Sequence, residues 1–219
     1  MSTLCKRRVV DALLILFTLS CVAAAIVVAS RLGQASEDRA DPTLNATQFT
    51  TLTLNGHVLG LADARRRIVV FSDFQCTFCD EMHTAIGKLL REDSTVSVVY
   101  RHFPLKQNPR AYAAALASEC LVDEQQFFQF ANLVYSKQDS LGRYSLSDFA
   151  TQVGVRDSVS FQRCGDSERA RTRVREDVAA ATELRITGTP LLIVDGRLVR
   201  GAIPLDSLRS LLRAPPDSQ

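Results

Sequence analysis

Residues 71–83 decide the fold of this chain, and they read Phe71-Ser72-Asp73-Phe74-Gln75-Cys76-Thr77-Phe78-Cys79-Asp80-Glu81-Met82-His83. The preceding residues 68–71 are apolar and partly β-branched, which predicts a buried strand. Apolar residues then recur at helical spacing, at Phe78, Met82, Ile86, Leu89 and Leu90. The motif is therefore expected to lie between the end of a strand and the start of an amphipathic helix.

The two cysteines of this motif fall at the first turn of the predicted helix. Unpaired amide donors and the helix dipole favour negative charge there, so a thiolate at Cys76 would be stabilised. The thiolate is the form of cysteine that attacks disulfides. Cys79 follows three residues later on the same side of the turn, close enough to form a disulfide with Cys76. The spacing predicts a reversible dithiol site.

The length, composition and net charge of the chain limit the kinds of protein that it can be. It has 219 residues, of which 46% are hydrophobic, and a net charge of +2. This length suits one domain with an accessory part and allows a sizeable core. The small net charge gives no polyelectrolyte character, so nucleic acid is not expected as a partner.

The N-terminal region has the pattern of a membrane anchor. Residues 12–29 form a run of 18 positions without a charge, which as a helix spans about 27 Å, close to the thickness of a bilayer core. Three basic residues at 6–8 precede the run, so the positive-inside rule places the N-terminus in the cytosol and exports the rest. The alternative is a cleaved signal peptide, whose apolar core is usually about 7–15 residues. We expect a retained transmembrane helix over residues 9–30.

The rest of the chain alternates between strand and helix patterns. Residues 49–54 alternate and are rich in Thr, which predicts a first strand before the turn Asn55-Gly56. After the cysteine motif come a buried strand, a block of helices, two strands and a helix, at residues 96–103, 108–184, 190–194, 198–202 and 205–213. This order predicts one α/β sheet that carries an inserted helical lobe.

Four motifs together carry a family resemblance. They are residues 71–79, Tyr100-Arg101-His102-Phe103-Pro104-Leu105, Ala117-Ser118-Glu119-Cys120 and Thr187-Gly188-Thr189-Pro190. With them, residues 48–213 resemble the thioredoxin superfamily, and more closely its DsbA-like branch of exported thiol–disulfide oxidoreductases. The resemblance implies a thioredoxin fold with an inserted helical lobe, here preceded by one N-terminal transmembrane helix.

The expected organisation has five parts. They are a cytoplasmic tail at 1–8, the anchor at 9–30, a polar linker at 31–47, a thioredoxin domain made of 48–104 and 185–214, and a helical insertion at 105–184. The polar, Pro-containing linker has no apolar period and is typical of a tether.

Pro190 and Thr189 gain a role through the resemblance. In the family this proline follows a cis bond and faces the two cysteines, and a cis X–Pro bond is a fixed feature of a fold. The Thr189 backbone would then lie beside the sulfurs, where an extended substrate segment can pair with it by strand addition. The alternative is an ordinary proline at the start of a strand.

Cys120 and Cys164 both fall in the helical block. If the domain is exported, its compartment permits disulfides, and a second pair indicates a structural cross-link. Closing a loop of about 45 residues could stabilise the fold by roughly 4 kcal/mol. Two buried free thiols, or a second redox pair that relays electrons to or from Cys76, are the alternatives.

Other polar residues near the motif admit competing interpretations. His83 follows Cys79 by four residues, so Cys76, Cys79 and His83 could bind zinc or copper from one helix face, although no fourth ligand follows in sequence. Asp73 could shuttle a proton to the resolving thiol or cap its turn. His102 is expected to be structural, and His57 to lie on a loop surface.

These inferences converge on a membrane-tethered thiol–disulfide oxidoreductase with its catalytic domain on the extracytoplasmic, periplasmic side. Cys76 would form a mixed disulfide with a cysteine of an exported protein, and Cys79 would resolve it. The resemblance implies no bound cofactor or metal, and a membrane partner, typically quinone-linked, that reoxidises the site. Oxidation is the expected direction. Reductase and isomerase activities, and an interaction domain that keeps the fold without the chemistry, remain open.

Overall fold

The computed structural model of the protein describes residues 20–22, 43–61 and 63–213. It divides into two units, Met1–Asp41 and Pro42–Gln219. In the first unit, residues 20–22 are helical.

The expected cytoplasmic tail and anchor lie outside the described residues, apart from residues 20–22, as does most of the expected linker. Within the part of the chain that is described, no helix has the length and apolar character needed to cross a membrane.

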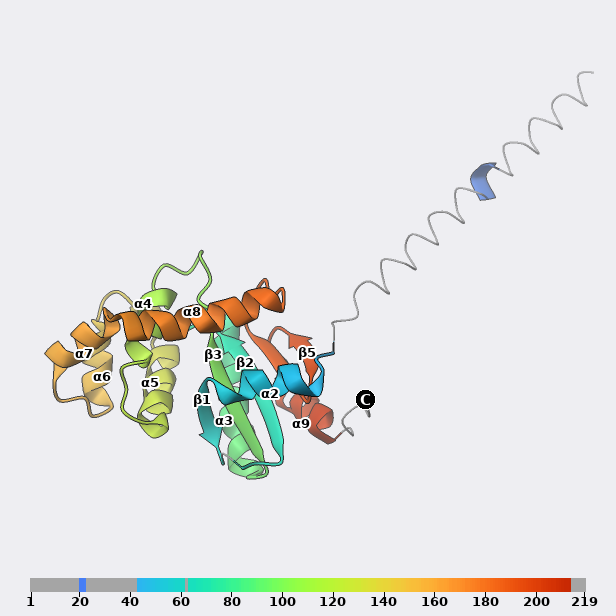
Figure 1. The fold of residues 1–219 in the computed structure, drawn as a ribbon, viewed down its shortest axis with the longest axis horizontal. Helices are drawn as coiled ribbons and strands as arrows, with labels where there is room; N and C mark the ends of the chain where they lie inside the picture. Colours follow the sequence, from blue (N-terminus) through green and yellow to red (C-terminus); the bar gives the residue numbers. More distant parts are fainter. Residues whose placement is uncertain (1–19, 23–42, 62, 214–219) are drawn as a thin grey trace, which may run out of the picture. The chain divides into compact units, whose positions relative to one another are not determined.

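A five-stranded sheet forms the centre of the second unit (Figure 1). Its strands are β1 (His57–Gly60), β2 (Arg66–Ser72), β3 (Val96–His102), β4 (Leu191–Val194) and β5 (Arg197–Arg200). They lie in the order β1-β3-β2-β4-β5, so β2 is the central strand. β2 and β3 run parallel, and the other neighbours are antiparallel. A parallel pair needs a crossover connection, which a helix after β2 supplies.

Helices cover both faces of this sheet. In chain order they are α2 (Ala46–Leu54), α3 (Thr77–Glu92), α4 (Ala111–Ser118), α5 (Glu124–Ser136), the short 3-10 helix η1 (Gln138–Ser140), α6 (Leu146–Gln152), α7 (Ser158–Gly165), α8 (Glu168–Glu183) and α9 (Leu205–Arg213). The central strand shows the layering, because successive side chains of a strand point to opposite faces. Ile68 and Val70 pack in the cluster that holds the apolar faces of α3 and α9. Val69 and Phe71 pack in a second cluster with residues of α2 and α8.

The predicted α/β fold with an inserted helical region is confirmed. α4 to α8 all lie in sequence between β3 and β4, and in Figure 1 α4 to α7 gather beside the sheet. α4 is rich in alanine, and its residues Ala111, Ala114 and Ala115 are buried. Small side chains let the neighbouring helices α7 and α8 approach α4 closely.

The prediction of a strand at residues 49–54 is wrong, because these residues belong to α2. The Asn45 side chain accepts from the Gln48 amide at 2.9 Å and the Gln48 side chain accepts from the Asn45 amide at 3.1 Å, which completes a capping box. This local start signal outweighs the strand preference of the Thr residues. The first strand instead begins at His57, after the turn that was predicted at Asn55-Gly56.

Candidate active site

The cysteine motif lies where the sequence places it, between the end of β2 at Ser72 and the start of α3 at Thr77. Cys76 is the N-cap residue of α3, and its side chain makes no capping hydrogen bond. The backbone amide of Cys79 donates to the carbonyl of Cys76 at 3.0 Å, so the pair spans the first turn. The Cys76 sulfur therefore does not cap the helix and lies at its N-terminus, where negative charge is favoured.

The two sulfurs of the motif lie in different environments. Both are free thiols, but Cys79 is buried and Cys76 is only partly covered. Burial raises the pKa of Cys79 far above its usual range. The hydrogen bond with the Cys79 side chain lowers the pKa of Cys76 to about 6, against the opposing effect of partial burial. At neutral pH the accessible sulfur is thus the ionised one.

Thr189 and Pro190 lie beside the cysteines because of the register between β4 and β2. Leu191, the first residue of β4, pairs with Phe71 near the end of β2. The residues just before β4 are therefore brought next to the loop that follows β2. The Thr189–Pro190 peptide bond is cis, and the Cys76 sulfur lies 3.4 Å from the Thr189 carbonyl oxygen.

A glutamine from the insertion supports the cysteine loop, and sequence reasoning missed it. The Nε2 of Gln138, in η1, donates to the carbonyl oxygen of Phe74 at 3.0 Å and to that of Cys76 at 2.9 Å. These carbonyls lie just before the first full turn of α3, and the insertion thereby fixes the path of the loop. No local pattern around Gln138 indicates a partner more than 60 residues away.

The Asp73 carboxylate is a structural tie within the site. It accepts hydrogen bonds from the backbone amides of Gln75 at 2.7 Å and Leu105 at 2.8 Å, and from the Asn108 side chain at 2.8 Å. Burial raises its pKa, against the lowering effect of these donors. Of the two expected roles, the hydrogen bonds support that of a cap, extended to the loop that follows β3.

A buried set of hydroxyl groups lies behind Cys79. The Tyr135 hydroxyl is 2.7 Å from the Ser72 Oγ and 2.8 Å from the Tyr100 hydroxyl. Burial raises the pKa of both tyrosines, so both stay neutral. Burial is the main cause of the raised Cys79 pKa, and the Ser72 hydroxyl opposes it. The three hydroxyls come from β2, β3 and α5, and nothing in the sequence links them.

Among the described residues, Cys76, Cys79 and His83 do not form a group of potential metal ligands. The Nε2 of His83 instead lies 2.7 Å from the Asn132 Oδ1, and its ring packs on Tyr135 with centroids 4.8 Å apart. The only such group among the described residues lies elsewhere, around His57.

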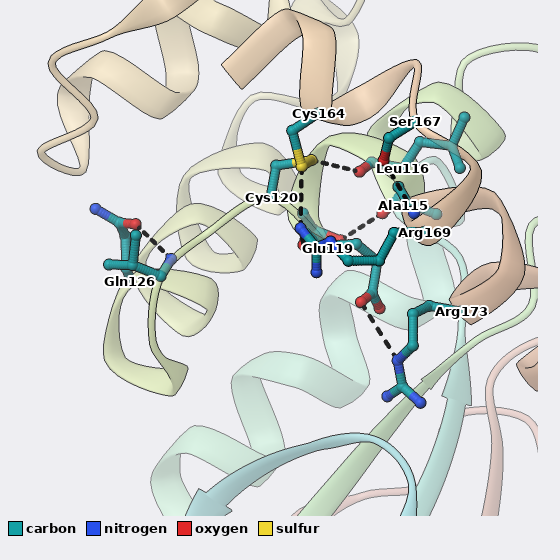
Figure 2. The surroundings of a disulfide bond; sticks show 12 residues. Ala115, Leu116, Glu119, Cys120, Gln126, Cys164, Ser167, Arg169 and Arg173 are labelled. Carbon is teal, nitrogen blue, oxygen red and sulfur yellow. Dashed lines mark hydrogen bonds and ion pairs between the residues drawn. A yellow bond between two sulfur atoms is a disulfide. The ribbon is translucent and has the colours of Figure 1, made fainter. Parts of the chain in front are cut away.

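The second cysteine pair forms a disulfide in the helical insertion (Figure 2). Cys120 follows the end of α4, Cys164 lies in α7, and their Cα atoms are 5.8 Å apart. The guanidinium of Arg169, in α8, donates to the Cys164 sulfur at 3.1 Å and to the Glu119 carbonyl at 3.2 Å. The disulfide and this arginine together connect three helices of the insertion.

Comparison with known proteins places the chain in a family. The family described as thioredoxin matches residues 52–214. Among curated proteins, the Na(+)/H(+) antiporter NhaA 3 of Salinispora tropica is 31% identical over 153 residues, which cover 69% of this chain and 23% of the antiporter. An antiporter NhaA 1 of Mycolicibacterium gilvum is 33% identical over 162 residues, covering 72% of this chain and 26% of the antiporter. The chain thus spans about a quarter of the length of these relatives.

Solved structures share the fold at low sequence identity. The thiol-disulfide exchange protein alpha-DsbA2 of Wolbachia pipientis superposes with a TM-score of 0.67 at 20% identity, covering 76% of this chain and 91% of that one. ScsC of Proteus mirabilis, in a transitional conformation, gives a TM-score of 0.65 at 17% identity and covers 97% of both chains. A periplasmic thioredoxin-like protein of Salmonella enterica serovar Typhimurium gives 0.60 at 20% identity, covering 78% and 97%.

The chain belongs to the thioredoxin family. Its fold, with the helical insertion, is the one that the solved DsbA and ScsC structures share, and its Cys76–Cys79 pair lies at the start of α3 in that fold.

Proposed function

We propose that this protein exchanges thiols and disulfides through Cys76 and Cys79, outside the cytoplasm and in the oxidising direction. The observation that carries the proposal is the contrast between an accessible sulfur with a pKa of about 6 and a buried neighbour with a raised pKa. The accessible sulfur is the nucleophile and the point of attack. The buried one is shielded from solution. It is the leaving group when a substrate thiolate attacks Cys76 in the oxidising direction, and it resolves the mixed disulfide in the reverse direction.

The oxidising reaction proceeds in two balanced exchanges. A substrate thiolate attacks the Cys76 sulfur of the Cys76–Cys79 disulfide, a new disulfide forms, and Cys79 leaves as a thiolate that takes up a proton. A second substrate thiolate then attacks the substrate sulfur of the mixed disulfide and releases the Cys76 thiolate. The substrate loses two electrons and the site gains them. A low pKa makes Cys76 a good leaving group and stabilises the reduced site, which favours oxidation of the substrate.

Thr189 and Pro190 would hold the substrate during this exchange. The Thr189 backbone lies beside the Cys76 sulfur, so an extended peptide that pairs with it would carry its cysteine to the site. Backbone pairing needs no particular side chain. The substrates would be exported proteins with cysteines, engaged while partly unfolded.

The protein would act at the cell membrane, with its N-terminus in the cytosol and residues 9–30 as a single-pass anchor. The fold shared with a periplasmic thioredoxin-like protein supports this location, and so do relatives that are named as antiporters. A membrane partner, typically quinone-linked, would reoxidise the site. Anchoring in the same membrane would raise the effective concentration of each protein for the other.

The experiment that tests the direction is a redox titration of the Cys76–Cys79 pair in glutathione buffers, with the two thiols counted by alkylation and mass spectrometry. We expect a potential more oxidising than that of thioredoxin, between about −230 and −120 mV. A potential near about −270 mV would make the protein a reductant. The Cys120→Ala/Cys164→Ala variant, titrated in parallel, identifies the signal of the first pair.

A further inference from the structure

Three polar side chains converge in the core at a place where the sequence suggested only a surface loop and a structural residue. His57 opens β1, His102 ends β3, and Glu119 is the C-cap residue of α4. In the antiparallel pair of β1 and β3, His57 lies opposite Tyr100. His102 is two residues further along β3, on the same face as Tyr100, so the two imidazoles become neighbours.

The cluster is largely withdrawn from solvent. The side chains of His102 and Glu119 are only 1% and 5% exposed. His57 is not on a loop surface, since its side chain is 17% exposed and the ring stacks on Phe127 with centroids 3.6 Å apart. His57 is therefore the most exposed of the three side chains.

The three potential ligand atoms are spaced as in a metal site. The Glu119 Oε1 lies 3.1 Å from the Nε2 of His57 and 3.1 Å from the Nε2 of His102, and all three atoms lie within 4.8 Å of one another. In a tetrahedral zinc site with bonds of about 2.0–2.2 Å, two ligand atoms are about 3.3–3.5 Å apart. The two distances to Glu119 Oε1 are thus within a few tenths of an ångström of this spacing, and an ion would draw the two imidazole nitrogens to the same separation.

We propose that His57, His102 and Glu119 form a binding site for a zinc ion, with a water molecule as its fourth ligand. Two imidazoles with one carboxylate are an established zinc ligand set. Calcium and magnesium would need six or more oxygen ligands, and this cluster offers few. The site contains no sulfur and does not depend on the dithiol chemistry proposed above.

The surroundings of His57 orient it as a ligand. The Nδ1 of His57 lies 3.2 Å from the Glu124 Oε2, so Nδ1 can donate its proton to that carboxylate. Metal binding would displace the Nε2 proton and leave the Nε2 lone pair facing Glu119 and His102. A carboxylate that accepts from the far nitrogen of a metal-ligating histidine is the usual outer support of such a site.

The surroundings of Glu119 fix the third ligand, as Figure 2 shows. Its backbone carbonyl accepts from Arg169, and its neighbour Cys120 is anchored by the disulfide. Its second oxygen, Oε2, lies 3.7 Å from the Arg173 Nε, which leaves Oε1 towards the imidazoles. The carboxylates of Glu119 and Glu124 carry two negative charges, against the one positive charge of Arg173.

The test is equilibrium dialysis of the full chain against zinc chloride. The parent carries Cys76→Ser and Cys79→Ser, so that the dithiol cannot bind the metal. We expect one zinc ion per chain, and X-ray absorption at the zinc edge should show nitrogen and oxygen neighbours at about 2.0–2.1 Å with none at the sulfur distance of about 2.3 Å. In this parent, Glu119→Gln and His57→Gln should each weaken binding by at least about tenfold.

His83→Gln is the matched control, since it removes an imidazole outside the cluster and should leave zinc binding unchanged. Zinc should also raise the Tm of the parent and of His83→Gln, but not that of Glu119→Gln. Because Glu119 is buried and its replacement could impair folding, the more exposed His57→Gln provides the second test, with folding checked by circular dichroism without zinc. The proposal is overturned if no stoichiometric zinc binds, if both cluster variants bind as the parent does, or if sulfur neighbours appear.

Discussion

The two cysteine pairs of this protein differ in almost every structural respect. Cys76 and Cys79 are three residues apart in one turn of α3 and are both free thiols. Cys120 and Cys164 are 44 residues apart, join two helices and are bonded to each other. A bond within one turn can open and close while the backbone stays in place, whereas a bond between helices restrains the fold.

The comparison teaches that environment as well as spacing decides what a cysteine pair does. In the first pair, burial of one sulfur and exposure of the other separate their pKa values in opposite directions. In the second pair, Arg169 and the packing of α4 against α7 hold both sulfurs in place. We therefore assign chemistry to the first pair and architecture to the second, and each prediction below tests that division.

The largest effect is expected from Cys76→Ser, which should abolish the oxidation of a reduced test protein to the detection limit, because Cys76 is the accessible sulfur of the dithiol pair. The assay follows thiol loss in the test protein. The Cys120→Ala/Cys164→Ala variant is the control and should retain the activity while folded. An equal loss of oxidation activity in both variants would contradict the assignment of the chemistry to the first pair and of a structural role to the second.

Removing the second disulfide should cause the largest loss of stability among these variants. In the chain-entropy model, a closed loop of this length contributes about 4 kcal/mol to the free energy of unfolding. Urea denaturation of Cys120→Ala/Cys164→Ala against the parent measures the loss. A change below about 1 kcal/mol would show that packing alone holds the insertion together.

The pH dependence of alkylation should separate the two sulfurs of the first pair. In the reduced protein, iodoacetamide should modify Cys76 with a midpoint near pH 6, and about tenfold more slowly at pH 5 than at pH 7, because the thiolate reacts. Cys79 should stay unmodified until the protein unfolds. Since folding lowers the pKa of Cys76, the corresponding stabilisation is present above about pH 9 and is lost as the pH falls towards 6. An alkylation midpoint near pH 9 would show that the pKa of Cys76 is not lowered, and would contradict the proposed difference between the two sulfurs.

The smallest effect is expected from Arg169→Gln, which removes the hydrogen bonds to the Cys164 sulfur and the Glu119 carbonyl. Because Arg169 is exposed, the loss in unfolding free energy should be about 1 kcal/mol. Arg171→Gln is the matched control on the same helix, where the guanidinium donates to the Asp166 carbonyl and does not contact the disulfide in the described structure. Thermal unfolding of both variants should show the larger drop in Arg169→Gln.

The sequence predicted the parts of the site that depend on local order. A buried strand followed by an amphipathic helix placed Cys76 and Cys79 at a helix start, and that is where they lie. It failed at residues 49–54, where the alternation of Thr residues suggested a strand and the capping box of Asn45 made a helix.

The contacts that no pattern could reveal are those between distant segments. Gln138 bonds the cysteine loop from the insertion, and Tyr135 meets Ser72 from another helix. His57 was expected to lie on a loop surface, but strand pairing carries it into the core beside His102. Such contacts depend on the tertiary fold, which a single sequence does not display.

The most direct test of the central claim is to trap the mixed disulfide. The Cys79→Ser and Cys76→Ser variants are each mixed with a peptide that carries an activated disulfide, and the adducts are located by mass spectrometry. The asymmetry of the two sulfurs predicts one stable adduct at Cys76 in the first variant and none in the folded second variant. Adducts forming equally fast at Cys79 and at Cys76 would contradict it.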